Sequence, residues 1–192
     1  MTPRVDDGLT RCGWATSAAE YVGYHDEEWG IPLHGDDALF ERVCLEAFQS
    51  GLSWITILRK RPAFRAAFAG FSIDAVAAFT AADEERLMSD AGIVRNRAKI
   101  AAAVRNARAA QQVDEGLDAL LWSFAPDPPP PRPAALADVP ATSPGSVAMA
   151  RELKRRGFAF VGPTTAYALM QATGMVDDHV ASCFRAVTRT GA

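Results

Sequence analysis

Apolar residues recur at intervals of three and four along most of the chain, and this spacing limits the fold more strongly than any other feature of the sequence. Such a spacing is typical of helices that bury one face. Between Leu39 and Phe48 it predicts a helix over residues 37–50, with Asp36 or Asp37 as its N-cap. No stretch alternates convincingly between apolar and polar residues, so we expect an all-α fold with little or no sheet. The same spacing predicts further helices over residues 74–79, 83–90, 95–113, 116–124, 143–156 and 164–173.

Prolines interrupt the helical pattern after residue 126. Proline has no amide hydrogen to donate and clashes with the preceding turn, so the run Pro128–Pro131 cannot lie inside a helix. We expect residues 126–142 to form an extended surface loop, and residues 1–10 to be a loop or a flexible segment. Because the proline-rich loop is short enough to sit inside a domain, residues 1–192 are expected to form a single unit.

A helical hairpin is expected near the C-terminal end. One helix should end where Gly157 follows Arg156, and the next should begin near Thr164. Gly162 lies just before that second helix, where backbone N–H groups have no partner within the helix and can hold a phosphate. The alternative is a plain hairpin in a core, and this segment alone does not decide between the two.

Two Cys/His pairs lie near opposite ends of the chain, Cys12 with His25 and His179 with Cys183. Thiolate and imidazole are preferred zinc donors, and four protein ligands leave no open coordination position, so such a site would be structural. The interval between His179 and Cys183 would put both on one face of a helix. Alternatively, the cysteines are small buried apolar residues and the histidines form ordinary hydrogen bonds. Spacing alone leaves both interpretations open, whereas Cys44, in an apolar helical stripe, is expected to be core.

The charges are unevenly distributed, although the net charge of −3 does not indicate a nucleic-acid partner. Acidic residues dominate before residue 51, and basic residues cluster at 59–65, 95–108 and 154–156. These clusters form either a basic face for a polyanion or ordinary solvated helix faces. The sequence contains no membrane-length apolar run and no apolar signal core, and its three cysteines suit a reducing compartment. We therefore expect a cytoplasmic protein that does not contact membranes.

Six short segments form an ordered set over most of the chain. They are Arg11-Cys12-Gly13-Trp14, Tyr24-His25-Asp26-Glu27-Glu28-Trp29-Gly30, Cys44-Leu45-Glu46, Gln49-Ser50-Gly51-Leu52-Ser53-Trp54, Asp90-Ala91-Gly92-Ile93, and Gly157-Phe158 with Val161-Gly162. The set resembles the bacterial DNA-3-methyladenine glycosylase I family. The resemblance runs from about Arg11 to about Cys183 and leaves out the first ten residues, the proline-rich loop and the last few residues.

The resemblance implies an all-helical, helix-hairpin-helix DNA glycosylase fold, with two helical lobes around a base-binding cleft. Members of this family excise N3-methylated adenine from duplex DNA, so the implied partner is double-stranded alkylated DNA. The sequence leaves the oligomeric state open, and we expect a monomer by default. The resemblance also implies a structural zinc ion held by Cys12, His25, His179 and Cys183. Joining chain ends so far apart in sequence would stabilise the fold, because it removes conformational freedom from the unfolded chain.

The resemblance further implies a base pocket in which Trp14, Tyr21, Tyr24 and Trp54 hold the extruded base and Glu46 is the catalytic residue. N3-methylated adenine is cationic, so aromatic faces attract it and its glycosidic bond is already weakened. We expect Glu46 to accept a hydrogen bond from the base while water attacks the sugar, without a covalent lysine intermediate. Taken singly, such aromatic residues are more often core, and such a glutamate is more often solvated.

The family match also assigns DNA contacts. Gly51 and Leu52 correspond to the segment that enters the gap left by the extruded nucleotide. Phosphates are expected to bind the hairpin at Gly157, Gly162, Thr164 and Thr165, helped by the basic residues Lys154, Arg155 and Arg156. Asp177 either caps a helix beside His179, which we favour, or assists the reaction.

Two rival functions come from other classes of protein. A zinc hydrolase, in which Glu46 activates a metal-bound water, requires an open coordination position, whereas the four-ligand set predicts a closed one. A zinc-stapled DNA-binding module without catalysis would bind DNA and release no methylated adenine.

Overall fold

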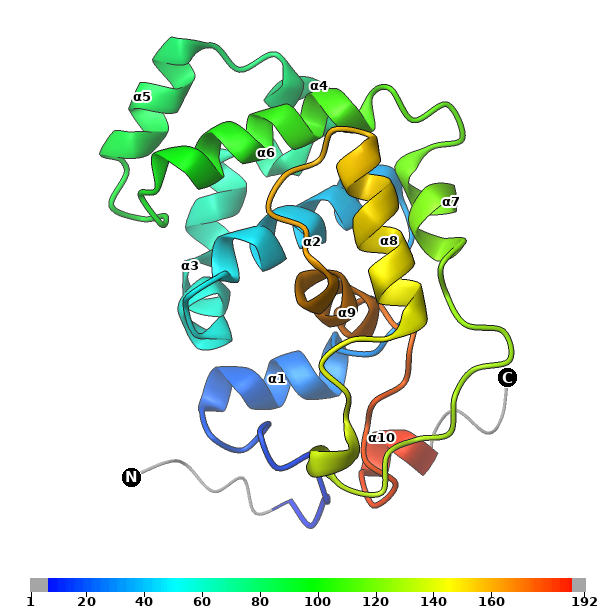
Figure 1. The fold of residues 1–192 in the computed structure, drawn as a ribbon. Coiled ribbons are helices and arrows are strands. Elements are labelled where there is room, and N and C mark those ends of the chain that lie inside the picture. Colours follow the sequence, from blue (N-terminus) through cyan, green and yellow to red (C-terminus); the bar gives the residue numbers. More distant parts are fainter. Residues whose placement is uncertain (1–6, 188–192) are drawn as a thin grey trace.

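The computed structural model describes residues 7–187, and this part of the chain folds into helices joined by turns and loops, with no strand (Figure 1). The all-α prediction is therefore confirmed. The helices are α1 Ala19–Glu27, α2 Asp36–Gln49, α3 Trp54–Ala67, α4 Ile73–Ala77, α5 Ala81–Ser89, α6 Arg97–Ala110, α7 Leu117–Trp122, α8 Pro144–Arg155, α9 Pro163–Ala172 and α10 Phe184–Val187, with 3-10 turns η1 Ala69–Phe71 and η2 Leu136–Asp138. None of the described helices is long and apolar enough to cross a membrane.

Every predicted helix is present, and each ends within a few residues of its predicted bounds. Local capping explains much of this agreement. Thr80 and Asp83 form a reciprocal capping box at the start of α5, and the Ser143 side chain accepts from the N–H of Ser146 at the start of α8. Gly157 follows α8 with a φ of +97°, a conformation that favours glycine at a helix end.

Helices α1, α3 and α10 were not predicted. In α3, Pro62 lies inside the helix, where a proline removes one backbone hydrogen bond. The helix nevertheless buries Ile57 and Phe64 completely. Packing of these side chains stabilises α3 more than the proline weakens it, and such packing is not readable from local sequence.

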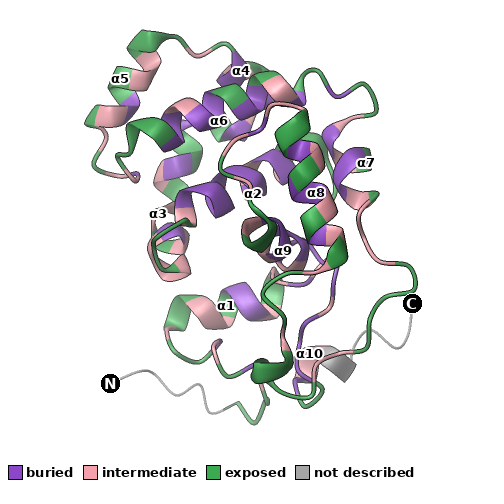
Figure 2. Cartoon of the chain, in the orientation of Figure 1, coloured by how far each residue is buried: buried purple, intermediate pink, exposed green. Residues whose placement is uncertain are grey.

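Helix α2 lies at the centre of the fold and packs against α3, α6, α7 and α9. Figure 2 shows it buried along most of its length, among helices whose outer faces are exposed. Leu39, Phe40, Leu45 and Phe48 of this helix are almost fully buried, and so is Cys44, as expected. This packing holds α2 in place. The side chains near its C-terminal end that point away from the core therefore have fixed positions.

The two ends of the described chain meet below α1 (Figure 1). The N–H of Phe184 donates to the carbonyl of Thr10 at 2.8 Å, and Cys12 packs with Val180 and Cys183 in a small cluster separate from the main core. The proline-rich segment 126–142 passes the same place, where the N–H of Ala181 donates to the carbonyl of Pro133 at 2.9 Å. The segment is irregular apart from η2, as its prolines predict.

Candidate active site and metal centre

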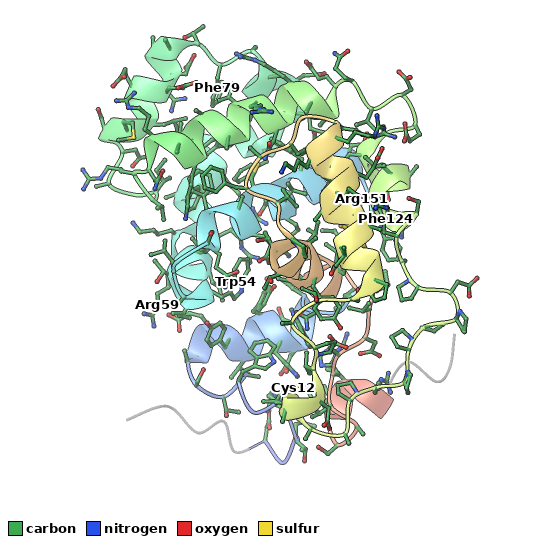
Figure 3. All side chains as sticks on the ribbon, viewed as in Figure 1. Cys12, Trp54, Arg59, Phe79, Phe124 and Arg151 are labelled. Carbon is green, nitrogen blue, oxygen red and sulfur yellow. The ribbon has the colours of Figure 1, made fainter. Side chains whose placement is uncertain are left out.

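A cavity of about 580 Å³ is bordered by α1, the end of α2, the start of α3 and one face of α9. It contains all five residues predicted for the base pocket: Trp14, Tyr21, Tyr24, Glu46 and Trp54. In Figure 3, Trp54 lies at the start of α3, next to α1. Residues that are up to 40 positions apart in sequence thus share one cavity, because α2 carries the chain from α1 to α3 through the core.

The aromatic side chains of the cavity touch one another. The Trp14 ring lies edge-on to Tyr21 at 5.6 Å and to Trp29 at 5.1 Å between centroids. The rings of Tyr24 and Trp54 are tilted by 44° at 5.4 Å. The indole Nε1 of Trp54 is buried without a hydrogen-bond partner, which is a costly arrangement that a bound polar ligand would relieve.

Glu46 is one of two acidic residues that line this cavity, and it is 5% exposed. Burial raises the pKa of its carboxyl group to about 8, and the nearby Arg42 opposes this effect. Arg42 lies one helical turn earlier and donates to Glu28 at 2.7 Å, so its charge is shared with another carboxylate. Among the described residues none donates a hydrogen bond to Glu46. A cationic group in the cavity would therefore stabilise the ionised carboxylate.

The cavity also contains residues that the sequence analysis did not single out. Asp178 is buried, and its Oδ2 accepts from the Tyr167 hydroxyl and from Gln171 Nε2, both at 2.7 Å. Leu136 and Val139 come from the segment expected to be only a surface loop. Asp178 could have been noticed beside His179, but no local signal predicts that Leu136 and Val139 reach this wall. Ser17, Trp29, Gln49 and Ala168 complete the lining.

The four predicted metal donors are buried together, with their donor atoms within 4.8 Å of one another. Cys183 Sγ lies 3.4 Å from His25 Nε2 and 3.6 Å from His179 Nδ1, and Cys12 Sγ lies 3.7 Å from His179 Nδ1. Tetrahedral bonds of about 2.3 Å to sulfur and about 2.1 Å to nitrogen would separate such atoms by about 3.6 Å. The donor set therefore fits a closed tetrahedral metal ion.

Both histidine rings have partners on the side away from the cysteines. His25 Nδ1 lies 2.7 Å from Asp26 Oδ1, and His179 Nε2 lies 3.2 Å from the carbonyl oxygen of Trp29. Such contacts fix the ring orientation and direct the other nitrogen at a metal. Burial lowers the pKa of His179 to about 4 and also lowers that of His25, so both rings are neutral near pH 7, as metal ligands must be.

The prediction that His179 and Cys183 share one face of a helix is wrong. Residues 177–180 are irregular, and a turn follows in which the N–H of Cys183 donates to the carbonyl of Val180 at 2.8 Å. Helix α10 begins only at Phe184. A tight turn brings residues four apart nearly as close as a helix does, so the donors converge without one.

Asp177 does not cap a helix, contrary to expectation, because no helix begins there. Its carboxylate pairs with Arg132 at 2.7 Å and accepts a longer hydrogen bond of 3.4 Å from the N–H of His179. The ion pair thus ties the proline-rich segment to the segment that carries two metal donors.

The residues predicted to contact DNA lie on two connections. Gly51 follows α2 with a φ of +79°, and the next residue, Leu52, is 41% exposed. On the second connection, Gly162 caps α9 and Pro163 occupies its first position, which leaves the N–H groups of Thr164 and Thr165 without intrahelical partners.

Acidic neighbours pair with most basic side chains of the clusters at 59–65 and 154–156, whereas in the cluster at 95–108 only Arg97 has an acidic partner among the described residues. Arg155 and Arg156 pair with Glu152, and Arg156 also pairs with Glu115. Lys154 is exposed on α8 and forms no ion pair within the described residues. The charges of the clusters at 59–65 and 154–156 are thus largely balanced within the fold. Further pairs are Arg59 with Glu20, Arg61 with Glu28, Arg65 with Glu41, and Arg97 with Glu85.

Comparison with known proteins places this arrangement in one family. Residues 14–186 match the methyladenine glycosylase family. The chain is 45% identical over 179 residues to DNA-3-methyladenine glycosylase 1 of Escherichia coli (strain K12), covering 91% of this chain and 96% of that protein. A crystal structure of 3-methyladenine DNA glycosylase I superimposes with a TM-score of 0.86 at 45% identity, covering 91% of this chain and 98% of that one. A 34% identical variant of 3-methyladenine DNA glycosylase I in complex with 3-methyladenine has a TM-score of 0.85, covering 91% and 96% of the two chains. The chain therefore belongs to the methyladenine glycosylase family.

Proposed function

We propose that this protein hydrolyses the N-glycosidic bond of 3-methyladenine in alkylated duplex DNA. The observation that carries the proposal is a buried carboxylate without a hydrogen-bond donor, Glu46, in a cavity walled by tryptophan and tyrosine rings. A flat, cationic base suits such a cavity, because it offers a charge to the carboxylate and a face to the rings. The 3-methyladenine complex of a related protein supports the same ligand.

In this proposal the target nucleotide leaves the duplex and its base enters the cavity. Trp14, Tyr21, Tyr24 and Trp54 contact the faces and edges of the ring. The Glu46 carboxylate accepts a hydrogen bond from an amino group at the base edge. Neutral adenine gains less binding energy from Glu46, because burial keeps the Glu46 carboxyl group protonated unless a cation enters the cavity. Charge thus distinguishes the lesion from the normal base.

The chemical step needs little acid catalysis in this proposal. The methylated base departs as a neutral molecule, because it already carries the positive charge that protonation would otherwise supply. Glu46 holds the leaving group while water adds to the sugar carbon and loses a proton to solvent. No lysine lines the cavity among the described residues, which supports hydrolysis without a covalent intermediate.

We propose further that Cys12, His25, His179 and Cys183 hold a zinc ion with a structural role. Two thiolates and two imidazoles are a typical zinc set, and their spacing suits its bond lengths. The ion would supply a crosslink between the chain ends. The rival zinc hydrolase needs a ligand-free position, whereas all four donors converge here and Glu46 is not among them.

The DNA contacts are proposed at the two connections described above. Leu52 would enter the gap in the duplex, and the start of α9, with Gly157, Gly162, Thr164 and Thr165, would bind a phosphate. Lys154 would add a charge nearby. Because this affinity would depend on phosphates, it should fall as salt is raised. Action as a monomer and a cytoplasmic location stay predictions from the sequence.

An excision assay tests the proposal. Alkylated duplex DNA is incubated with the wild type, with Glu46→Gln, and with Glu41→Gln as a control on the same helix outside the cavity. Release of free 3-methyladenine by the wild type and the control, but not by Glu46→Gln, is expected. Binding of the duplex without any release at high enzyme concentration would favour the non-catalytic module instead.

A further inference from the structure

Helix α6 holds the connection that carries Leu52. The Lys99 side chain is 7% exposed, and its Nζ donates to the carbonyl oxygens of Phe48 at 2.9 Å and Ser50 at 2.5 Å. These carbonyls end α2 immediately before Gly51, and a cation at the end of a helix interacts favourably with its dipole. Lys99 therefore fixes where α2 stops and where the Gly51–Leu52 turn begins.

The same helix holds the α8–α9 hairpin. Asn106 is fully buried, its Oδ1 accepts from the N–H of Ala159 at 2.8 Å, and its Nδ2 donates to the carbonyl of Ala159 at 3.1 Å. Arg105 adds a bond of 2.7 Å from Nε to the carbonyl of Gly157. Both backbone groups of Ala159 are thus bound by one side chain.

The residue after Ala159 shows why the hairpin needs such support. Phe160 has a φ of +58°, which is unfavourable for a residue with a side chain, and its ring is 42% exposed. A strained backbone with little side-chain burial persists only where neighbouring contacts hold it. The two bonds from Asn106 act on the adjacent peptide and so stabilise this conformation.

Lys99 and Asn106 are seven residues apart on α6, which is about two helical turns, so they share one face and lie about 10 Å apart along the axis. We infer that they are positioning residues that set the distance between the Leu52 turn and the phosphate-binding hairpin. The inserted Leu52 side chain and the phosphate-binding hairpin must contact the same duplex at a fixed separation. A rigid helix between the two connections keeps that separation constant. This inference rests on the proposed function and extends it to residues outside the cavity.

The test uses a DNA duplex that contains a stable abasic-site analogue with 2-aminopurine beside it, so binding and unstacking are read without chemistry. Lys99→Met should lower the fluorescence gain at saturation several-fold while Kd changes little. Lys99→Arg should restore part of the gain, because it returns a cationic donor. Asn106→Asp keeps the acceptor but loses the donor, and should raise Kd about 10-fold with a nearly normal gain.

Arg108→Met is the matched control. Arg108 also lies on α6 and binds the carbonyl oxygens of Ala77 and Phe79 at the end of α4, away from both connections. The Arg108→Met variant should lose as much thermal stability as Lys99→Met does, whereas its DNA binding and its fluorescence gain should stay unchanged. If Lys99→Met, Asn106→Asp and Arg108→Met changed the DNA readouts in proportion to their loss of stability, α6 would only support the fold and the inference would be overturned.

The outcome also separates this inference from the proposed function. A wild type that unstacks the duplex but releases no 3-methyladenine from alkylated DNA would contradict the glycosylase proposal and leave the role of α6 intact. If the wild type releases the base but neither Lys99→Met nor Asn106→Asp alters the DNA readouts, the glycosylase proposal stands and the role of α6 is contradicted. A wild type that does not bind the duplex would contradict both.

Discussion

The metal centre and the cavity are neighbours with opposite character. Trp14 joins them, because its ring lies 5.3 Å from His25 on one side and lines the cavity on the other. Every donor of the Cys/His cluster faces another donor, and both histidines have outer partners. In the cavity, Glu46 and the Trp54 Nε1 are buried without such partners. Satisfied polar groups stabilise a fold, whereas unsatisfied ones are costly until a ligand binds.

From this contrast we expect the cluster to contribute mainly to stability and the cavity mainly to activity. Substitutions in the cluster should therefore reduce the free energy of unfolding first, and substitutions in the cavity should reduce excision first.

The largest effect is expected from Cys183→Ser, which removes one of four donors. Loss of the metal and of the link between the chain ends should lower the free energy of unfolding by about 4 kcal/mol or more. Metal analysis and chemical denaturation measure this directly. Cys44→Ala is the control, because it removes a buried thiol outside the cluster and should keep the metal. Full metal content in Cys183→Ser would contradict the ligand assignment.

The second-largest effect is expected on the rate of base excision. Glu46→Gln keeps the shape of the side chain but removes its charge, so single-turnover excision should fall by about 10² to 10³-fold. Its metal content and folding should stay normal. Excision within a few-fold of wild type, in a folded variant, would remove Glu46 from the proposed mechanism.

The stability difference between the wild type and the same variant should depend on pH. Folding raises the pKa of Glu46 from 4.5 to about 8, so the folded state holds a proton that the unfolded state has lost between these values. Wild-type stability therefore declines from pH 4.5 to 8, whereas Gln does not titrate. The free energy of unfolding of Glu46→Gln should therefore exceed that of the wild type by on the order of 4 kcal/mol above pH 8, and by little near pH 4.5.

Denaturation of wild type and Glu46→Gln at matched pH measures this difference. Protonation of the metal ligands at low pH affects both proteins and cancels in the comparison. A difference that does not change with pH would mean that the carboxyl group is not perturbed by burial.

The smallest effect should come from Leu136→Ala at the cavity rim. Leu136 is 42% exposed and contributes one apolar side chain to the wall, so KM should rise by about 2- to 5-fold with kcat nearly unchanged. Val147→Ala, on a similarly exposed residue outside the cavity, should have no effect on either constant. Equal kinetics for both variants would show that the proline-rich segment does not shape the substrate site.

Much of this architecture was predictable from local sequence. Capping residues such as Thr80 and Ser143, and a glycine such as Gly157, act within a few residues, so helix ends were placed closely. The family motifs indicated the base-pocket residues and the four metal donors. Helix α3 was not predicted, because its interior proline is offset only by the burial of Ile57 and Phe64.

The sequence by itself determined the all-α class, the boundaries of seven helices and the chemical types available to each site, since these depend on side-chain spacing and local hydrogen bonds. Tertiary structure alone decided that Leu136 and Val139 line the cavity, that Asp177 pairs with Arg132, and that a turn presents His179 and Cys183. It also decided that α6 binds both connections that we propose to contact DNA. Such contacts join residues tens of positions apart, and no local pattern records which distant segments packing will bring together.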